Sequence, residues 1–147
     1  MTVTLFGHRD TPENIKPTLK NTLSLLISGH DADLFYVGNN GSFDRMSADV
    51  LSDLSKQYPH IKFFIVSAYL NNKKTAFPDL TIYPEGLETT PRRYAIIKRN
   101  KWMINRSDTI VTYANNTITN FFRLMTYATT RGKTIINLAT KKDYPSE

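Results

Sequence analysis

The sequence predicts an α/β protein whose parallel sheet is covered by helices on both faces. Short apolar runs alternate along the chain with longer segments in which apolar residues recur every three or four positions. Strand and helix patterns that alternate in this way are typical of parallel sheets buried between helices. The length, 147 residues, is that of one domain, and residues 1–147 are expected to form a single unit.

Five apolar runs are predicted to be strands. The first run alternates toward Leu5 and Phe6 and ends at Gly7. Right-handed crossovers with one reversal favour the order 3-2-1-4-5, a Rossmann-like doubly wound sheet with its switch point between strands one and four. The predicted strands are residues 2–7, 33–37, 61–67, 109–113 and 134–138.

Four segments have the apolar spacing of helices. In residues 13–28, Leu19 and Leu23 lie on one face, Pro17 falls in the first turn, where its missing N–H is harmless, and Gly29 ends the helix. The other predicted helices are residues 43–57, residues 91–105 with Pro91 at the first helical position, and residues 117–130 before Gly132.

Two segments lack a periodic pattern. Residues 71–88 are polar and contain Pro78, Pro84 and Gly86, so they are predicted to form a long loop. Loops of this length are usually functional or mobile. The segment from Lys141 onward is polar and is expected to fray.

Composition restricts the classes of partner. The absence of cysteine excludes disulfides and thiolate metal sites and fits a cytoplasmic protein. No apolar run approaches the length of a membrane span, the N-terminus lacks a secretory pattern, and the three histidines lack metal-ligand spacing, so no membrane, metal or cofactor is predicted. The formal net charge of +6 favours anionic partners, although it also suits general solubility.

The turn after the second strand is a candidate phosphate site. Backbone N–H groups at such a turn, together with the dipole of the following helix, can hold an anion. Ser42 could cap the helix and add a hydroxyl donor, whereas Asp44 would repel a phosphate and suits a ribose hydroxyl or a base amine. The same turn also occurs without a ligand. Its candidate residues are Gly38, Asn39, Gly41, Ser42, Phe43 and Asp44.

Two further strand ends should meet this turn at the switch point. After the first strand come Gly7, His8 and Arg9, where Arg9 could bind an anion and His8 could contact a base or transfer a proton. After the fourth strand come Tyr113, Asn115 and Asn116, which are candidate ligand-binding residues. The alternative is a packed His8 and an Arg9 paired with a nearby carboxylate.

The basic segment after Pro91 supplies the remaining candidates. Arg92 and Arg99 share one helical face, so Arg99 is expected at a pocket wall. Glu88 in the preceding loop and Asp44 are the candidate catalytic carboxylates, and Glu88 is also a candidate ligand-binding residue. The catalytic residues themselves are not identified by any motif.

The sequence resembles an uncharacterised bacterial and phage branch of the SLOG superfamily. The resemblance runs along nearly the whole chain. It is carried by Phe6-Gly7-His8-Arg9, the 38–44 turn, Tyr83-Pro84-Glu85-Gly86-Leu87-Glu88, Arg99-Asn100-x-Trp102-Met103 and Ile135-Ile136-Asn137-Leu138. It implies a Rossmann-like fold and a nucleotide-type ligand. The superfamily includes cytokinin-activating phosphoribohydrolases, the DNA-processing protein DprA and nucleotide-sensing domains.

Two departures from that superfamily bear on function. Relatives carry a Gly-Gly-Ala-type turn after the fourth strand, where this chain has Asn115-Asn116-Thr117-Ile118. Backbone approach to a phosphate is easiest at glycine, so the site is expected to be altered in specificity or weakened. The phosphoribohydrolase signature with its catalytic glutamate is also missing, which disfavours a hydrolase.

The sequence is therefore consistent with three functions. The first is binding of a nucleotide or nucleotide-derived small molecule, as a sensor or sequestering module. The second is a hydrolase acting on a nucleotide N-glycosidic or phosphate bond, and the third is single-stranded nucleic-acid binding. A homodimer contact is a further hypothesis, because Phe121, Phe122, Leu124 and Met125 crowd one helix.

Overall fold

The fold is a single parallel sheet of six strands. The computed structural model describes residues 1–69, 78–114 and 119–139. Across the sheet the strand order is β4-β3-β2-β1-β5-β6, and every neighbouring pair is parallel. The strands are β1 (Thr2–Gly7), β2 (Leu34–Val37), β3 (Lys62–Val66), β4 (Thr81–Ile82), β5 (Thr109–Tyr113) and β6 (Thr134–Asn137).

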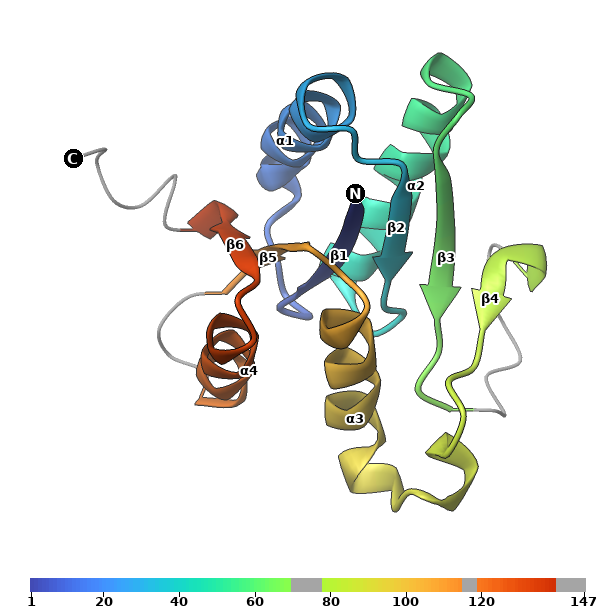
Figure 1. The fold of residues 1–147 in the computed structure, drawn as a ribbon, viewed down its shortest axis with the longest axis vertical. Coiled ribbons are helices and arrows are strands. Elements are labelled where there is room, and N and C mark those ends of the chain that lie inside the picture. The colour runs from blue at the N-terminus through green and yellow to red at the C-terminus, as the bar shows by residue number, and fades with distance from the viewer. Residues whose placement is uncertain (70–77, 115–118, 140–147) are drawn as a thin grey trace.

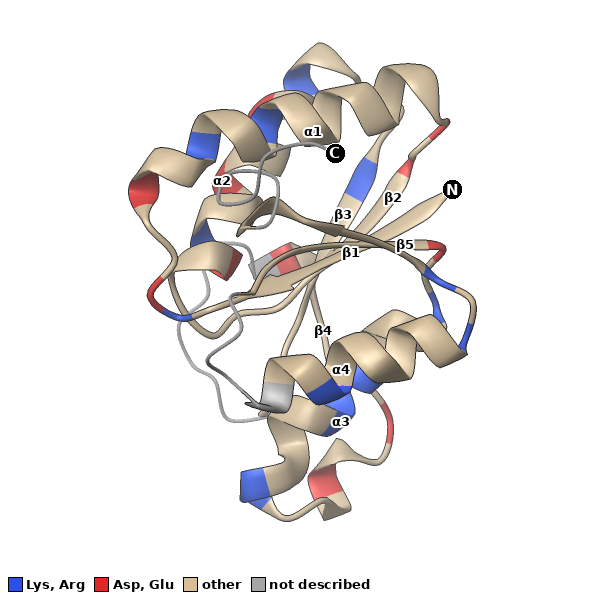
Figure 2. Cartoon of the chain, turned by 90° about the vertical axis from the view of Figure 1, so that its left-hand side faces the viewer, with Lys and Arg blue, Asp and Glu red and all other residues tan. Residues whose placement is uncertain are grey.

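Four helices cover the sheet in two layers (Figure 1). Helices α1 and α2 lie on one face, and α3 and α4 lie on the other, which Figure 2 shows edge-on. The helices are α1 (Lys16–Gly29), α2 (Ser42–Gln57), α3 (Arg92–Asn105) and α4 (Thr119–Thr130). Short 3-10 turns span Glu13–Ile15, Pro78–Leu80 and Leu87–Thr89.

The predicted fold class and strand order are confirmed, with one addition. The five predicted strands occur in the predicted order, and β4 adds a sixth at the edge beside β3. The prediction of one unbroken loop over residues 71–88 is wrong in its described part, because Thr81 and Ile82 pair with Ile65 and Val66. A two-residue strand is too short to show alternation of apolar and polar residues in the sequence. It becomes a strand because it pairs with β3.

Alternation along β1 builds both halves of the core. Val3 and Leu5 belong to the apolar cluster beneath α1 and α2, whereas Phe6 belongs to the cluster beneath α3 and α4. Thr4 lies on the same side as Phe6 and is fully buried. Its hydroxyl donates to the carbonyl oxygen of Met103 (3.1 Å) and contacts the hydroxyl of Ser107, near the end of α3. A buried hydroxyl with partners avoids the cost of desolvation.

Two details of α3 and α4 differ from expectation. Helix α3 begins at Arg92, and Pro91 is the N-cap residue with extended backbone rather than the first helical residue. In α4, Leu124 is buried and Phe121 and Met125 are partly buried, whereas Phe122 is 72% exposed. Most of the apolar crowding in α4 is thus explained by packing inside the chain, and the homodimer contact stays a prediction.

Three predictions fall wholly or partly outside the described residues: the first part of the loop (71–77), the start of the fourth helix at residue 117, and the fraying of the tail from Lys141. In the part of the chain that the structure describes, no helix combines the length and apolar character needed to cross a membrane.

The end of β1 packs so closely on α2 that only glycine fits at position 7. A Cβ built on Gly7 would lie 2.6 Å from Cγ of Phe43, which is fully buried. We therefore expect Gly7→Ala to lower the free energy of unfolding by about 1–3 kcal/mol, because Phe43 must move in a packed core.

Gly29→Ala is the matched control, since a Cβ there would meet nothing within 4 Å. Urea unfolding of both variants measures the difference, and we expect the control to be unchanged or slightly more stable. Equal stability of Gly7→Ala and the parent chain would contradict the close contact.

Candidate functional site

A cavity of about 600 Å³ opens at the carboxyl ends of β1 and β5. From β1 the chain passes through α1 to β2 on one side, whereas from β5 it passes through α4 to β6 on the other side. The strand order therefore reverses between β1 and β5, and the cavity lies at this switch point of the topology. Open α/β sheets bind ligands in this crevice. A volume of this size is typical of small-molecule sites. The strand-end motifs in the sequence predicted a site at the same edge.

Two glycine-containing turns are braced against each other beside the cavity. Gly41 has φ of +125°, and a Cβ there would lie 2.5 Å from the Cα of Arg9. The backbone N–H of Ser42 donates to the carbonyl oxygen of Arg9 (2.9 Å), and the Ser42 hydroxyl donates to that of Thr11 (3.0 Å). The turn after β2 and the turn after β1 therefore form one unit.

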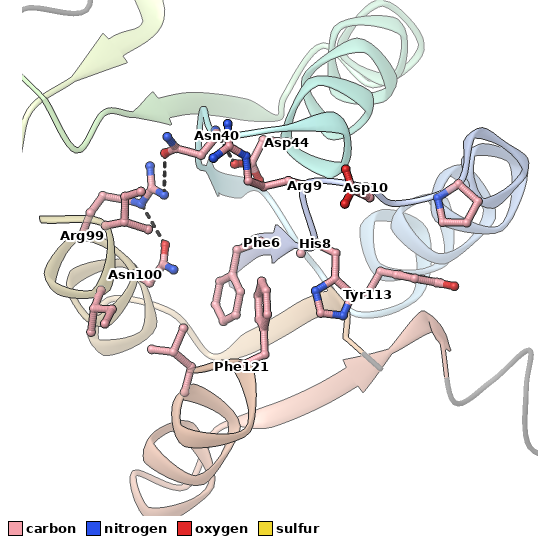
Figure 3. Close-up of a pocket in the computed structure, with 15 residues that line it drawn as sticks. Phe6, His8, Arg9, Asp10, Asn40, Asp44, Arg99, Asn100, Tyr113 and Phe121 are labelled. Carbon is pink, nitrogen blue, oxygen red and sulfur yellow. Dashed lines mark hydrogen bonds between the residues drawn. The ribbon is translucent and has the colours of Figure 1, made fainter. Parts of the chain in front are cut away.

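The Arg99 side chain forms the polar wall of the cavity (Figure 3). It is 2% exposed and reaches from α3 into the sheet edge. Its Nε donates to Oδ1 of Asn100 (2.8 Å), and Nη1 donates to the carbonyl oxygen of Val66 (2.8 Å). Nη1 also donates to Oδ1 of Asn39 (3.2 Å), and Nη2 donates to Oδ1 of Asn40 (2.9 Å). The guanidinium is thus held by neutral oxygen acceptors from three parts of the chain.

Gly38 separates Arg99 from the buried carboxylate of Asp44. A Cβ at Gly38 would lie 2.7 Å from Oδ2 of Asp44 and 3.2 Å from Cζ of Arg99. The two charged groups do not form an ion pair, since the described residues contain one ion pair, between the N-terminal amine and Asp33. Glycine is therefore required here because any side chain would displace one of the two groups.

Only one of the two carboxylate oxygens of Asp44 has a hydrogen-bond partner. It lies in the first turn of α2, where Gly41 is the N-cap residue, and Oδ2 accepts the backbone N–H of Asn40 (2.7 Å). A carboxylate at this position also interacts favourably with the helix dipole. Oδ1 is buried and has no hydrogen-bond partner.

Burial perturbs both charged groups. It raises the pKa of Asp44 above its ordinary value of 3.8, although the charge of Arg99 and the N–H of Asn40 oppose the shift. Burial likewise lowers the pKa of Arg99, opposed by Asp44 and Tyr69. A guanidinium nevertheless stays protonated in proteins. The cavity wall therefore carries a cation beside a carboxyl group that holds its proton more tightly than usual.

Aromatic rings line the opposite side of the cavity. Phe6 and Phe121 stack with ring centroids 6.0 Å apart, and the His8 ring meets Phe121 edge-on at 4.6 Å. Tyr113, in register with Gly7 across β1 and β5, also lines the space. Figure 3 shows these rings facing the polar wall across the cavity. One side can stack a planar group while the other forms hydrogen bonds.

The predicted site residues fall into five groups. The cavity is lined by Gly7, His8, Arg9, Asp44, Arg99 and Tyr113. The turn that supports its wall contains Gly38, Asn39, Gly41 and Ser42. Phe43 lies in the core beneath Gly7 rather than in the cavity. Glu88 and Arg92 line a separate hollow of about 200 Å³, and Asn115 and Asn116 lie outside the described residues.

Two expectations about the turn after β2 need correction. Ser42 does not cap α2, because it is the first helical residue and its hydroxyl bonds to Thr11 instead. The Asn40 N–H, one of the groups expected to hold phosphate, already donates to Asp44. The chain's own carboxylate thus occupies the place at which an anion was expected.

Sequence reasoning missed several cavity residues. Asn40 follows the candidate Asn39 in the sequence, and Asn100 follows Arg99. Both amides accept a hydrogen bond from Arg99, and an amide adjacent to a candidate arginine could have indicated such a contact. The sequence does not show whether Phe6 and Phe121 line a cavity or belong to the core, because apolar residues in a strand or helix occur in both places. Residues that line the cavity but were not candidates are Phe6, Asp10, Pro12, Asn40, Ile96, Ile97, Asn100, Phe121 and Leu124.

The candidate catalytic carboxylates differ in position. Asp44 lines the cavity, whereas Glu88 is exposed in the separate hollow. No group of three or more His, Cys, Asp or Glu side chains within residues 1–69, 78–114 and 119–139 is arranged to hold a metal ion.

No protein-family model matches the sequence, and no curated protein matches it. The fold is similar to that of DNA processing protein A from Helicobacter pylori, for which a single-stranded DNA binding mode is known. The TM-score is 0.64 at 14% identity, over 92% of this chain and 63% of that chain. It is also similar to DprA from Streptococcus pneumoniae, with a TM-score of 0.57 at 9% identity, over 99% of this chain and 62% of that one. The chain therefore spans less than two thirds of either protein, and the likeness establishes a DprA-like, Rossmann-like fold.

The hydrogen bonds of Arg99 generate a stability prediction. Lysine cannot reproduce the planar fork, so Arg99→Lys leaves buried oxygens of Val66, Asn39 or Asn40 without a donor. We expect the free energy of unfolding to fall by about 2–3 kcal/mol. Urea unfolding measures it, with the exposed Arg93→Lys as control. Equal losses of free energy of unfolding in the two variants would show that the hydrogen bonds of the Arg99 guanidinium do not stabilise the fold.

The raised pKa of Asp44 generates a pH prediction. A folded-state pKa above the unfolded value means that protonation stabilises the fold fully below pH 3.8, and that this contribution is lost as the pH rises through the folded-state pKa. Asparagine is neutral throughout. We therefore expect Asp44→Asn to raise the Tm relative to the parent chain at pH 7, and the difference to shrink toward pH 3.

Thermal unfolding from pH 3 to pH 8 measures that difference. Asp49→Asn, on the exposed side of α2, should show little difference at any pH. A Tm difference for Asp44→Asn that grows on acidification would contradict the assigned direction of the pKa.

Proposed function

We propose that this chain binds single-stranded nucleic acid and that one nucleotide unit occupies the cavity at the switch point. The observation that carries the proposal is the pairing of an aromatic wall with a polar wall across about 600 Å³. Stacking on aromatic side chains and hydrogen bonding to base edges are the ways in which proteins hold unpaired bases. The DprA-like fold supports the same class of ligand, since one of the two similar proteins binds single-stranded DNA.

Charge at this edge of the sheet supports the proposal. Arg9 lies at the cavity and is exposed, and the amino ends of the helices face the same edge, where they attract anions. Near the start of α3, the guanidinium of Arg92 lies 4.2 Å from the ring centroid of Tyr69, and that of Arg93 lies 4.9 Å from that of Tyr94. Cations interleaved with aromatic rings suit the alternating phosphates and bases of a single strand.

A free nucleotide is the second candidate. The specific observation in its favour is that buried polar groups, Arg99 and Asp44, gather inside the cavity rather than along an open groove. Such an arrangement suits recognition of one small molecule. In that case the protein would act as a sensor or sequestering module.

Binding of a labelled 20-nucleotide single strand, followed by fluorescence anisotropy, tests the proposal. We expect the strand to bind at low salt. Its affinity should fall by about 10³-fold between 50 and 200 mM salt if several phosphates are neutralised by the protein. Arg9→Ala should weaken binding, whereas Arg45→Ala, exposed on α2 and away from the cavity, should not.

The two candidates give different results. Absence of binding at low salt, or equal binding of a duplex with the same sequence, would reject the single-strand proposal. If mononucleotides alone raise the Tm, the free-nucleotide function holds instead. A ligand at 100 times its Kd should add about 2.7 kcal/mol to the free energy of unfolding.

A further inference from the structure

The helix layer formed by α3 and α4 is far more positive than the layer on the other face of the sheet. α3 contains five Lys or Arg residues and α4 contains one, and neither helix contains Asp or Glu. In the opposite layer, α1 and α2 together contain four Lys or Arg residues and three Asp residues. Figure 2 shows blue positions and no red ones on α3 and α4. An excess of one sign of charge on one side of a protein favours a partner of the opposite sign.

Five cations form a patch on these two helices and the turn after α4, which we call the α3–α4 face. Its cations are Lys101, Arg106, Arg123, Arg131 and Lys133. All are exposed except Lys133, which is partly buried, and none lines the cavity. Lys101 of α3 and Arg131 lie over the same ring, that of Tyr127, at 5.0 and 4.5 Å from its centroid. The two helices therefore present their cations on one surface.

Aromatic rings hold these cations without neutralising them. The Tyr127 hydroxyl exchanges two hydrogen bonds with the side chain of Asn105 (2.9 and 3.1 Å), and Cζ of Arg106 lies 4.0 Å from the centroid of Trp102. A cation–π contact positions a cation and leaves its charge in place. The single ion pair among the described residues does not involve this face. Since the cations themselves cover the rings, the face suits phosphates rather than stacked bases.

The surface between the helix ends is hollowed and polar. An open hollow of about 550 Å³ is lined by Asn105, Thr130, Arg131 and Lys133. One carboxylate, that of Glu85, lines a neighbouring hollow of about 210 Å³ together with Lys101 and Arg106. A single negative charge beside five positive ones leaves the face strongly cationic, with room for a phosphate group.

The alternative explanation of these cations is that they offset the helix dipoles. A dipole places about half a negative charge at the carboxyl end of a helix. Arg106, Arg131 and Lys133 lie at or just beyond the carboxyl ends of α3 and α4, so three positive charges meet roughly one negative charge. Lys101 and Arg123 lie farther from those ends. The dipoles therefore account for a minor part of the charge, and the remainder is available to an external anion.

On the basis of the function proposed above, we propose that the α3–α4 face binds phosphates of the same single strand whose nucleotide occupies the cavity. The two surfaces adjoin, because Asn100 and Leu124 line the cavity and their sequence neighbours Lys101 and Arg123 belong to the face. One base is held in the cavity, and the phosphates that follow it lie along the outer side of the helices. Contacts of this kind add affinity and salt dependence without reading the bases.

A pair of double variants tests the face. Lys101→Gln with Arg131→Gln removes two of its cations, and Lys20→Gln with Lys56→Gln removes the same charge from exposed positions on α1 and α2. We expect the first variant to bind the labelled single strand on the order of 10-fold more weakly than the control at about 100 mM salt. The slope of log affinity against log salt should also shrink by about 1.4, since each phosphate contact with a single strand contributes about 0.7.

The outcomes separate the face from the cavity. Equal affinity and equal salt slope in the two double variants would overturn the face and leave the cavity, which Arg9→Ala tests, intact. Weaker binding in the Lys101 and Arg131 variant together with no effect of Arg9→Ala would support the face and reject the cavity function. Absence of strand binding by the parent chain rejects both.

Two further measurements keep the test decisive. Thermal unfolding shows whether each variant is folded, and Arg123→Gln with Lys133→Gln replaces the first variant if that one is not, with the same expected loss. Vesicles of anionic phospholipid serve as the competing partner. Vesicle binding that depends on Lys101 and Arg131, with strand binding unchanged in the variant, would assign the face to a membrane surface and overturn the proposal.

Discussion

The buried guanidinium of Arg99 is the interaction on which the site depends. One side chain joins α3 to the end of β3 through Val66 and to the turn after β2 through Asn39 and Asn40. These segments are far apart in sequence, and the sheet brings their ends to one edge. A buried cation requires hydrogen-bond acceptors on every side, so the positions of the two asparagines follow from that of Arg99.

The sheet could be predicted because its causes are local. Apolar runs that end in glycine or polar residues predicted β1, β2 and β5, and helical spacing predicted α1 and α2 to within a few residues. β4 could not be predicted in this way, because a two-residue strand forms only when β3 offers an edge. Ser42 was assigned a capping role for the same reason: its hydroxyl bonds to Thr11, which is distant in sequence and reached only in the folded chain.

The sequence predicted some of the residues that line the cavity, but not the contacts that these residues make with one another. Parallel topology places Gly7, Asp44 and Arg99 at one edge. Motifs after the first two strands indicated Gly7 and Asp44, whereas helical spacing in the basic segment indicated Arg99. Arg92 was grouped with them because it shares a helical face with Arg99, and Glu88 because it is a carboxylate in the preceding loop. Both residues instead line another hollow. No pattern of residues reports that Asp44 already accepts the Asn40 N–H, since this depends on the path of the backbone. That contact occupies a backbone N–H that was expected to hold a phosphate.

The hydroxyl of Thr4 has a consequence at the other end of α3. It bonds to the carbonyl of Met103, one turn after Arg99, and contacts Ser107, so α3 cannot slide along β1 without breaking buried hydrogen bonds. The Arg99 fork is therefore in place before any ligand arrives. Little conformational entropy of the protein is then lost on association, and most of the ordering falls on the incoming molecule. A preorganised wall of this kind discriminates between ligands by the match of donors and acceptors, since it cannot rearrange to suit a poor one.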